Sequence, residues 1–352
     1  MEPASTNNTS RPKVAVVLLC WNCVDDIQKC IPSLQQMDYD NFCIVAVDNH
    51  STDGTADTIE RLYPEAVLIR NDKNLGAGGG YNTGAWYALE HGADYVWFLN
   101  ADTVVEPDLI TKVVAAGEAD PTVGLLSPGI YYLSDRTRLQ NCGGFLDWSR
   151  FLSHILFSFE ELDSIDPDDL WLPGTTLFIK RAVLEKIGAY DEKYFAYCED
   201  RDYSMTARAA GFKRRIVRAA KIYHRYHSVD FREVKKLPPH VIFFMTRNVY
   251  FFWMKHLKGF SKVRYFFHYV SEVFDKLGHY KEDGCENLLD VVCDAFYFAL
   301  RNIDGPWDRQ IQMPALIRKC FCACPFLVTD LLNGRFGAIA NRIFCGRSRK
   351  TI

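Results

Sequence analysis

The chain has 352 residues, of which 48% are apolar and 24% charged, and its formal net charge is -3 at pH 7. This composition excludes an intrinsically disordered chain, because it supplies enough apolar surface for a full core. The small net charge argues against a protein that binds nucleic acid over its whole surface. The twelve cysteines are scattered singly, a pattern that favours reduced thiols in a cytosolic protein over a zinc site.

Neither an export signal nor a membrane span is expected. Residues 1–12 are polar and contain no apolar signal-peptide core, so they are predicted to be a disordered leader. A membrane-spanning helix needs about 18 or more consecutive apolar residues. The densest apolar stretch begins at Val241 and is interrupted by Arg247 and Lys255, which leaves contact with a membrane surface as an open alternative.

Short apolar runs alternate with segments of helical spacing over the first hundred residues. Strands are predicted at 14–20, 42–47, 66–69 and 95–99, and helices at 25–34, from a cap at Ser51 or Thr52 to Tyr63, and at 82–91. This alternation predicts an α/β fold with an open, mostly parallel sheet and right-handed crossovers. Such sheets bind ligands at the carboxyl ends of their strands.

Polar motifs follow several of these predicted strands. Asp48 ends the second strand, where its carboxylate can accept hydrogen bonds from a nucleoside. The glycine-rich stretch from Asn74 to Gly84 runs into a predicted helix, which favours a phosphate-binding loop over a plain flexible turn. Asn100 and Asp102 follow the fourth strand. A carboxylate there can hold Mg²⁺ or Mn²⁺ together with a diphosphate, and a capped turn is the alternative.

An acidic cluster marks the second half of the chain. After a predicted strand at 177–179 and a helix at 181–187, Glu199, Asp200 and Asp202 open a further helix. Acidic residues are expected in a first helical turn from the helix dipole alone. A crowded carboxylate cluster nevertheless raises at least one pKa, and such a group suits general-base removal of a hydroxyl proton.

Taken in order from Val14 to about Tyr250, these motifs resemble glycosyltransferase family 2, and within it the bacterial rhamnosyltransferase-like branch. The resemblance is carried by DNHSTDGT, NLGAGGGYNTG, LNADTVV, PGTTLFIKR and IGAYDEKYFAYCEDRDYSMTARAAG, then by His224 and Arg247-Asn248. It implies the GT-A fold, a Rossmann-like, mostly parallel sheet flanked by helices, with a C-terminal helical extension. The DxD motif usual in the family is Asn-Ala-Asp here, so Asp102 is its only carboxylate.

The resemblance also implies roles for individual residues. Asp200 would be the general base, supported by Glu199 and Asp202. The metal would be held by Asp102 and His224, with His227 as the alternative histidine. The nucleotide would be bound by Asn22, Asp48, Asn74, Gly78, Gly79, Asn82, Asn100 and Ala101. The donor or acceptor sugar would be contacted by Trp171, Gly174, Thr175 and Arg247.

The implied activity is inverting transfer of a rhamnose-like or other hexose from a dTDP- or UDP-linked donor to a hydroxyl of a glycan or lipid-linked acceptor, in cell-surface polysaccharide synthesis. Residues 13–240 would form the catalytic domain, with a nucleotide-sugar half (13–125) and an acceptor half (126–240), and residues 241–352 the helical extension. The expected location is cytoplasmic, with peripheral contact to the inner membrane face through the basic and aromatic stretch 213–264 as one alternative. A homodimer also stays open.

Two other functions are alternatives to glycosyl transfer. A nucleotidyltransferase would share the nucleotide-binding fold, but residues 14–22 lack the glycine-rich signature with a lysine that it should carry. A non-catalytic relative that binds nucleotide sugars is the second alternative, since Asn100 in place of an aspartate would weaken metal binding.

Overall fold

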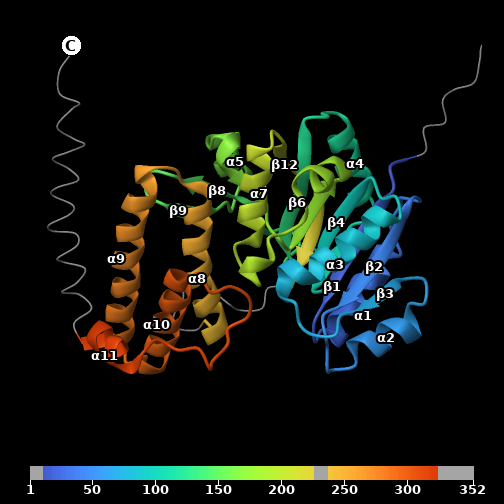
Figure 1. The fold of residues 1–352 in the computed structure, drawn as a ribbon. Helices are drawn as coiled ribbons and strands as arrows, with labels where there is room; N and C mark the ends of the chain where they lie inside the picture. Colours follow the sequence, from blue (N-terminus) through green and yellow to red (C-terminus); the bar gives the residue numbers. More distant parts are fainter. Residues whose placement is uncertain (1–10, 226–236, 324–352) are drawn as a thin grey trace, which may run out of the picture. The chain divides into compact units, whose positions relative to one another are not determined.

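The computed structural model describes residues 11–225 and 237–323 (Figure 1). The described residues fall into two compact units. The first is an α/β unit that runs to Phe195 and resumes at Glu199, and the second is a helical unit made of Ala196–Cys198 and the residues from 237 onwards.

The main sheet of the α/β unit begins with four parallel strands, as the sequence predicts. Their order in the sheet is β3-β2-β1-β4. Their bounds are β1 (Val14–Cys20), β2 (Phe42–Asp48), β3 (Val67–Arg70) and β4 (Tyr95–Asn100). The sheet continues beyond β4 as β11-β6-β12-β5, with β7 on β6, and here antiparallel and parallel pairs are mixed. These strands are β5 (Thr103–Val105), β6 (Val123–Tyr132), β7 (Leu139–Asn141), β11 (Thr176–Lys180) and β12 (Lys213–His224).

A smaller antiparallel sheet has the order β10-β8-β9. Its strands are β8 (Gly144–Asp147), β9 (Leu152–Ile155) and β10 (Leu170–Trp171), and the short helices α5 (Phe159–Ser164) and η1 (Pro167–Asp169) connect β9 to β10. The chain leaves β10 only a few residues before β11. The chain therefore passes from the small sheet directly into β11, the strand that lies between β4 and β6 in the main sheet.

Helices cover both faces of the main sheet (Figure 1). Side chains of β1 alternate between two buried clusters, because successive residues of a strand point to opposite faces. One cluster includes α1 (Val24–Leu34), α2 (Thr55–Leu62) and α4 (Leu109–Glu118). The other includes α3 (Gly76–Glu90), α6 (Arg181–Ile187) and α7 (Glu199–Ala209). Both faces of the sheet are thus closed, and polar groups gather at the strand ends.

Two local predictions are wrong. The glycine-rich stretch is not a loop, because α3 already begins at Gly76 rather than at Asn82. Helix α2 begins at Thr55 after Gly54, which has φ +85°, and the N–H of Thr55 donates to Asp53 Oδ1 at 3.0 Å. The predicted cap Ser51 instead accepts a hydrogen bond at Oγ from the backbone N–H of Asn22, 2.9 Å away.

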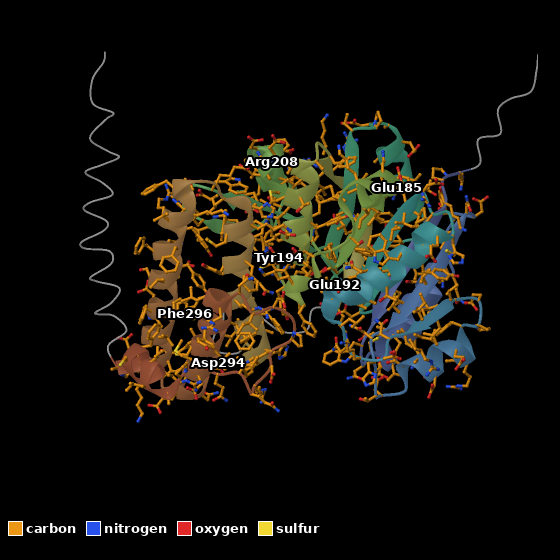
Figure 2. The ribbon with its side chains drawn as sticks, in the orientation of Figure 1. Glu185, Glu192, Tyr194, Arg208, Asp294 and Phe296 are labelled. Atoms are coloured by element: carbon orange, nitrogen blue, oxygen red, sulfur yellow. The ribbon has the colours of Figure 1, made fainter. Side chains whose placement is uncertain are left out.

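The helical unit contains α8 (Pro239–His256), α9 (Phe260–Glu282), α10 (Glu286–Arg301) and α11 (Ala315–Ala323). Helix α8 packs on α9 and α10, and its aromatic residues Phe243, Phe251 and Trp253 are buried. Phe296 of α10 is labelled in Figure 2, and the centroid of its ring lies 5.7 Å from that of Tyr269 in α9. The predicted C-terminal helices are confirmed. Within the described ranges, every helix is too short or too polar to cross a membrane.

Candidate active site

A buried carboxylate stands where β1 and β2 end. Cys20 and Asp48 are paired in the parallel register of these strands, and Asp48 is 4% exposed. Asp48 Oδ2 accepts a hydrogen bond from the N–H of Ser51 at 3.2 Å, whereas Oδ1 is buried and has no partner. Because a buried polar atom is normally hydrogen-bonded, Oδ1 fits a ligand that donates an N–H or O–H group.

Asn22 lies on the adjoining β1–α1 connection. Its backbone has φ +48°, in the left-handed region that Asn tolerates better than most residues. Its Oδ1 accepts a hydrogen bond from the N–H of Thr52 at 2.8 Å. Asn22 therefore ties the loop after β1 to the loop after β2, next to Asp48.

Asn49, which the sequence analysis did not single out, connects the end of β2 to the start of α3. It is 2% exposed, and its Nδ2 donates to Asn74 Oδ1 at 3.1 Å and to the carbonyl of Gly76 at 3.0 Å. Its Oδ1 accepts from the N–H of Leu75 at 3.0 Å. Asn74 Oδ1 also accepts from the N–H of Gly76 at 2.8 Å. The predicted nucleotide ligand Asn74 thus lies in a network that fixes the start of α3.

The first N–H groups of α3 are already occupied by protein oxygens. Besides those of Leu75 and Gly76, the N–H of Ala77 donates to the carbonyl of Phe195 at 2.6 Å. Gly78 and Gly79, predicted to line a phosphate, are buried against Glu192 and Leu75 respectively. The stretch therefore acts here as a closely packed helix start rather than as an open phosphate loop.

The side chain of Asn82 is likewise hydrogen-bonded to protein groups. Its Oδ1 accepts from the N–H of Tyr190 at 2.9 Å, and its Nδ2 donates to the carbonyl of Tyr190 at 2.9 Å and to Glu192 Oε1 at 3.0 Å. Glu192 lies in η2 (Glu192–Tyr194) and is labelled in Figure 2. All three contacts join α3 to the chain segment that leads into α7.

Asp102 and His224 are brought together although 122 positions separate them in the sequence. Strand β5 pairs antiparallel with the end of β12, with Thr103 opposite His224. His224 Nε2 lies 3.2 Å from Asp102 Oδ2, and the two side chains are each 18% exposed. His224 Nδ1 lies 2.9 Å from Gln140 Oε1. The alternative His227 lies outside the described residues.

This arrangement fits a divalent cation. If Nδ1–H donates to Gln140 Oε1, the neutral imidazole presents the lone pair of Nε2 beside the Asp102 carboxylate. Metal-bound histidines are commonly oriented in this way by a hydrogen bond at the other ring nitrogen. Among the described residues no group of three or more His, Cys, Asp and Glu is clustered for a metal. Further ligands would have to come from a diphosphate and water, as is usual for Mg²⁺ sites.

The two residues before Asp102 are held in place by the protein. Asn100 Oδ1 accepts from the hydroxyl of Tyr81 at 2.7 Å, and its N–H donates to the carbonyl of Thr175 at 3.0 Å. Ala101 is 5% exposed. Asn100 thus anchors the turn that carries Asp102, and it links that turn to the predicted sugar-binding segment at Thr175.

The acidic cluster opens α7 as predicted, and its three carboxylates have different surroundings. Asp200 Oδ2 accepts from the N–H of Gly174 at 3.0 Å, so two predicted site residues meet here. Asp202 is 2% exposed and accepts at Oδ1 from the hydroxyl of Tyr194, labelled in Figure 2, at 3.1 Å. Glu199 is 9% exposed, and its Oε2 is buried without a partner.

Burial, reinforced by the adjacent Asp200 carboxylate, raises the pKa of Glu199 to about 8. The predicted raised pKa therefore falls on Glu199. At pH 7 its carboxyl group is mostly protonated and can donate a hydrogen bond. Its neighbour Asp200 instead accepts the hydrogen bond from the N–H of Gly174, a predicted sugar contact.

Of the remaining predicted sugar contacts, Trp171 belongs to the α/β unit and Arg247 to the helical unit. Trp171 is 5% exposed with an unpartnered Nε1, and its ring lies 5.2 Å from the guanidinium carbon of Arg201. Arg247 lies in α8 of the helical unit and is 0% exposed. Its Nη1 donates to the carbonyl of Gly305 at 2.7 Å. A guanidinium engaged in this way within the helical core does not present itself to a sugar, so the structure contradicts that prediction.

Residues 15–188 match the family model described as Glycosyl transferase family 2. The chain carries a family 2 glycosyltransferase domain. This glycosyltransferase is 26% identical over 246 residues to an N-acetylglucosaminyl-diphospho-decaprenol L-rhamnosyltransferase of Mycobacterium tuberculosis, covering 64% of this chain and 80% of the relative. A poly-beta-1,6-N-acetyl-D-glucosamine synthase of Staphylococcus aureus is 25% identical, over 32% of this chain and 27% of the relative. The predicted family and its rhamnosyltransferase-like branch are confirmed.

Two solved structures are similar to this glycosyltransferase in fold. The mannosyltransferase PcManGT of Pyrobaculum calidifontis, in complex with GDP-Man and Mn²⁺, matches with a TM-score of 0.51 and 16% identity, covering 96% of this chain and 88% of that one. GalNAc-T7 with UDP, GalNAc and Mn²⁺ matches with a TM-score of 0.50 and 18% identity, covering 62% and 45%. The predicted GT-A fold is confirmed.

Proposed function

We propose that this glycosyltransferase moves a rhamnose-like or other hexose, with inversion, from a dTDP- or UDP-linked donor to a hydroxyl of a glycan or lipid-linked acceptor. The observation that carries the proposal is the Asp102–His224 pair oriented by Gln140, at the edge of the sheet where nucleotides bind in open α/β folds. The name of the mycobacterial relative, an L-rhamnosyltransferase for a diphospho-decaprenol acceptor, supports the donor and acceptor classes.

Each residue then has a chemical task. Asp48 Oδ1, the buried oxygen without a partner, accepts a hydrogen bond from the nucleoside. Asp102 and His224 would hold Mg²⁺ or Mn²⁺, and the cation would supply positive charge against the diphosphate. Asn22 and Asn100 position the loops on either side rather than contacting the donor through their engaged amide oxygens.

Asp200 removes the proton from the acceptor hydroxyl. The acceptor oxygen forms a bond to the anomeric carbon of the donor sugar from the face opposite the diphosphate. The bond from that carbon to the diphosphate breaks, and the nucleoside diphosphate leaves with the electron pair. Glu199, protonated at pH 7, donates a hydrogen bond that orients the acceptor, and Gly174 fixes the Asp200 carboxylate.

Transfer from radiolabelled nucleotide sugars to a diphospho-lipid acceptor tests the proposal. Asp200→Asn keeps the size of the side chain and removes its basicity, so turnover should fall about 100-fold or more while donor binding persists. Donor affinity is measured by calorimetry in parallel. If turnover at saturating donor survives in Asp200→Asn, the assignment of the base is refuted.

We also propose that the enzyme meets its lipid-linked acceptor at an anionic membrane surface through the turn between α8 and α9. At the start of α9, Phe260 is 62% and Val263 47% exposed. Three cations close to them in sequence are also exposed, namely Lys255 at the end of α8, Lys258 in the turn and Arg264 in α9. The sequence contains no acidic residue from Val234 to Ser271. Exposed apolar side chains that lie among exposed cations in the sequence suit the interface of an anionic bilayer.

Sedimentation with vesicles tests this surface. The protein should bind vesicles rich in phosphatidylglycerol at low salt and leave them at high salt, because basic residues contribute about 1 kcal/mol each near such a surface. Lys258→Glu combined with Phe260→Ser should abolish binding. Lys319→Glu, an exposed lysine on α11, is the matched control and should keep it. Equal binding to neutral and anionic vesicles would contradict the proposal.

A further inference from the structure

A short backbone segment with an unfavourable conformation leads directly into the carboxylates of α7. Phe195, Tyr197 and Cys198 have φ of +62°, +66° and +75°. The left-handed region is rarely adopted by residues other than glycine, and bulky side chains are the least tolerant of it. Cys198 is followed at once by Glu199 and Asp200. Strained backbone of this kind persists only where neighbouring groups hold it.

Asn248 of α8 holds this segment. Its Nδ2 donates to the carbonyl of Ala196 at 2.7 Å and to that of Tyr197 at 2.8 Å. Asn248 is 0% exposed. The two hydrogens of one amide group are thus assigned to two consecutive carbonyls of the strained segment, and both contacts lie within the helical unit.

Arg247 fixes which way the amide of Asn248 points. Its Nε donates to Asn248 Oδ1 at 2.9 Å, while its Nη1 donates to the carbonyl of Gly305. A guanidinium can only donate hydrogen bonds, so the oxygen of the amide must face it and the NH₂ group must face the segment. The buried arginine that the sequence assigns to a sugar therefore has a different partner, the side chain next to it.

We propose that Asn248 is a positioning residue, which holds the segment Ala196–Cys198 with Tyr197 and Cys198 in the left-handed region and so fixes the backbone from which Glu199 and Asp200 start. Arg247 acts through Asn248 by orienting its amide. The inference rests on the proposed role of Glu199 and Asp200 in accepting and orienting the acceptor hydroxyl. Neither residue touches substrate, so their effect is on the geometry of the reacting carboxylates.

Asn248→Asp is the sharpest test, because it keeps the shape and places an oxygen where the NH₂ group faced two carbonyls. We expect turnover to fall at least tenfold, the donor dissociation constant to stay within twofold, and the pH profile of turnover to shift as the surroundings of Glu199 change. Thr246→Val is the matched control: it lies on the same helix, is 1% exposed, and should leave turnover, pH profile and donor affinity unchanged.

Hydrogen exchange of the backbone amides of residues 196–200 gives a readout without substrate. Exchange there should be faster in Asn248→Asp than in the wild type and in Thr246→Val. Unchanged exchange and turnover in folded Asn248→Asp protein would overturn the proposal, and so would an equal loss of turnover and donor affinity. These outcomes are distinct from failure of the proposed function, in which Asp200→Asn would keep its turnover.

If the Asn248→Asp protein does not fold, the Arg247→Lys variant is measured instead. This change keeps a positive charge but removes the Nε–H donor that orients Asn248. It should speed exchange at residues 196–200 and lower turnover, with donor affinity retained. Normal exchange in Arg247→Lys would refute the orienting role.

Discussion

Glu199→Gln separates the charge of Glu199 from its shape, and the structure gives the expected size of the effect. The glutamine resembles the protonated carboxyl group that burial favours. A pKa raised from 4.5 to about 8 means that ionising Glu199 in the folded protein costs up to roughly 5 kcal/mol more than in the unfolded chain. Since the residue is 9% exposed, solvent screens little of this cost.

The sign follows from proton uptake. Between pH 4.5 and about 8 the folded state keeps a proton on Glu199 that the unfolded chain has lost. The contribution of Glu199 to stability is therefore fully present below the unfolded pKa and declines as the pH rises through the folded pKa. The glutamine variant does not titrate, so it should lose less stability than the wild type over this range.

Urea denaturation of both proteins at about pH 5 and about pH 9 measures the difference. From about pH 5 to about pH 9, the free energy of unfolding of Glu199→Gln should fall by at least about 2 kcal/mol less than that of the wild type. At pH 7 it should also keep turnover within about threefold, because the wild-type residue is already protonated there. Equal loss of stability by both proteins, or turnover as low as in Asp200→Asn, would refute the reasoning.

Two further predictions concern the metal pair and the packing of α3. Asp102→Ala should abolish transfer and remove the Mn²⁺-dependent thermal stabilisation by the donor. Its melting temperature without ligand should stay nearly unchanged. Transfer that survives in this variant after chelator treatment would contradict metal dependence. Gly84→Ala should cost about 1–3 kcal/mol of stability, because the added Cβ would lie 2.3 Å from Val17 Cγ1. Glu90→Ala on the exposed end of the same helix is the control, and equal stabilities would show that the helix shifts freely.

The sequence predicts the first half of the fold well because the local pattern and the tertiary environment agree. The run from Val14 to Cys20 is apolar at every position, and β1 is buried on both faces of the sheet. Such runs can be recognised without knowing the neighbouring strands. The same holds for α6, whose predicted bounds match the structure, and for the acidic first turn of α7.

The prediction of a loop over the glycine-rich stretch is wrong because the pattern has two physical explanations. Glycines allow a flexible loop, and they also allow a helix to approach its neighbours closely. Gly76, Gly80 and Gly84 recur every four residues, which places them on one face of α3. A Cβ at these positions would lie 2.1 Å from the carbonyl oxygen of Phe195, 2.4 Å from Leu19 and 2.3 Å from Val17. That spacing was the signal for a helix.

Residues that act through distant partners could not be found from local patterns. Gln140 sits in a short edge strand with no motif around it, and its importance arises only because β7, β6 and β12 pair to bring it to His224. Asn49, by contrast, stands within the recognised motif after β2, and its amide satisfies groups on the start of α3.

Two polar side chains, Arg247 and Asn248, are fully buried in the core of the helical unit. Burying Arg247 lowers its pKa to about 10, through the loss of solvent, and a buried charge is unfavourable unless it is paired or hydrogen-bonded. Three aromatic rings lie 5.1 to 5.4 Å from its guanidinium carbon and lessen this penalty. An apolar residue at this position would pack at lower cost, yet it could not orient the amide of Asn248. The arginine is therefore best explained by the neighbouring amide of Asn248, which it orients.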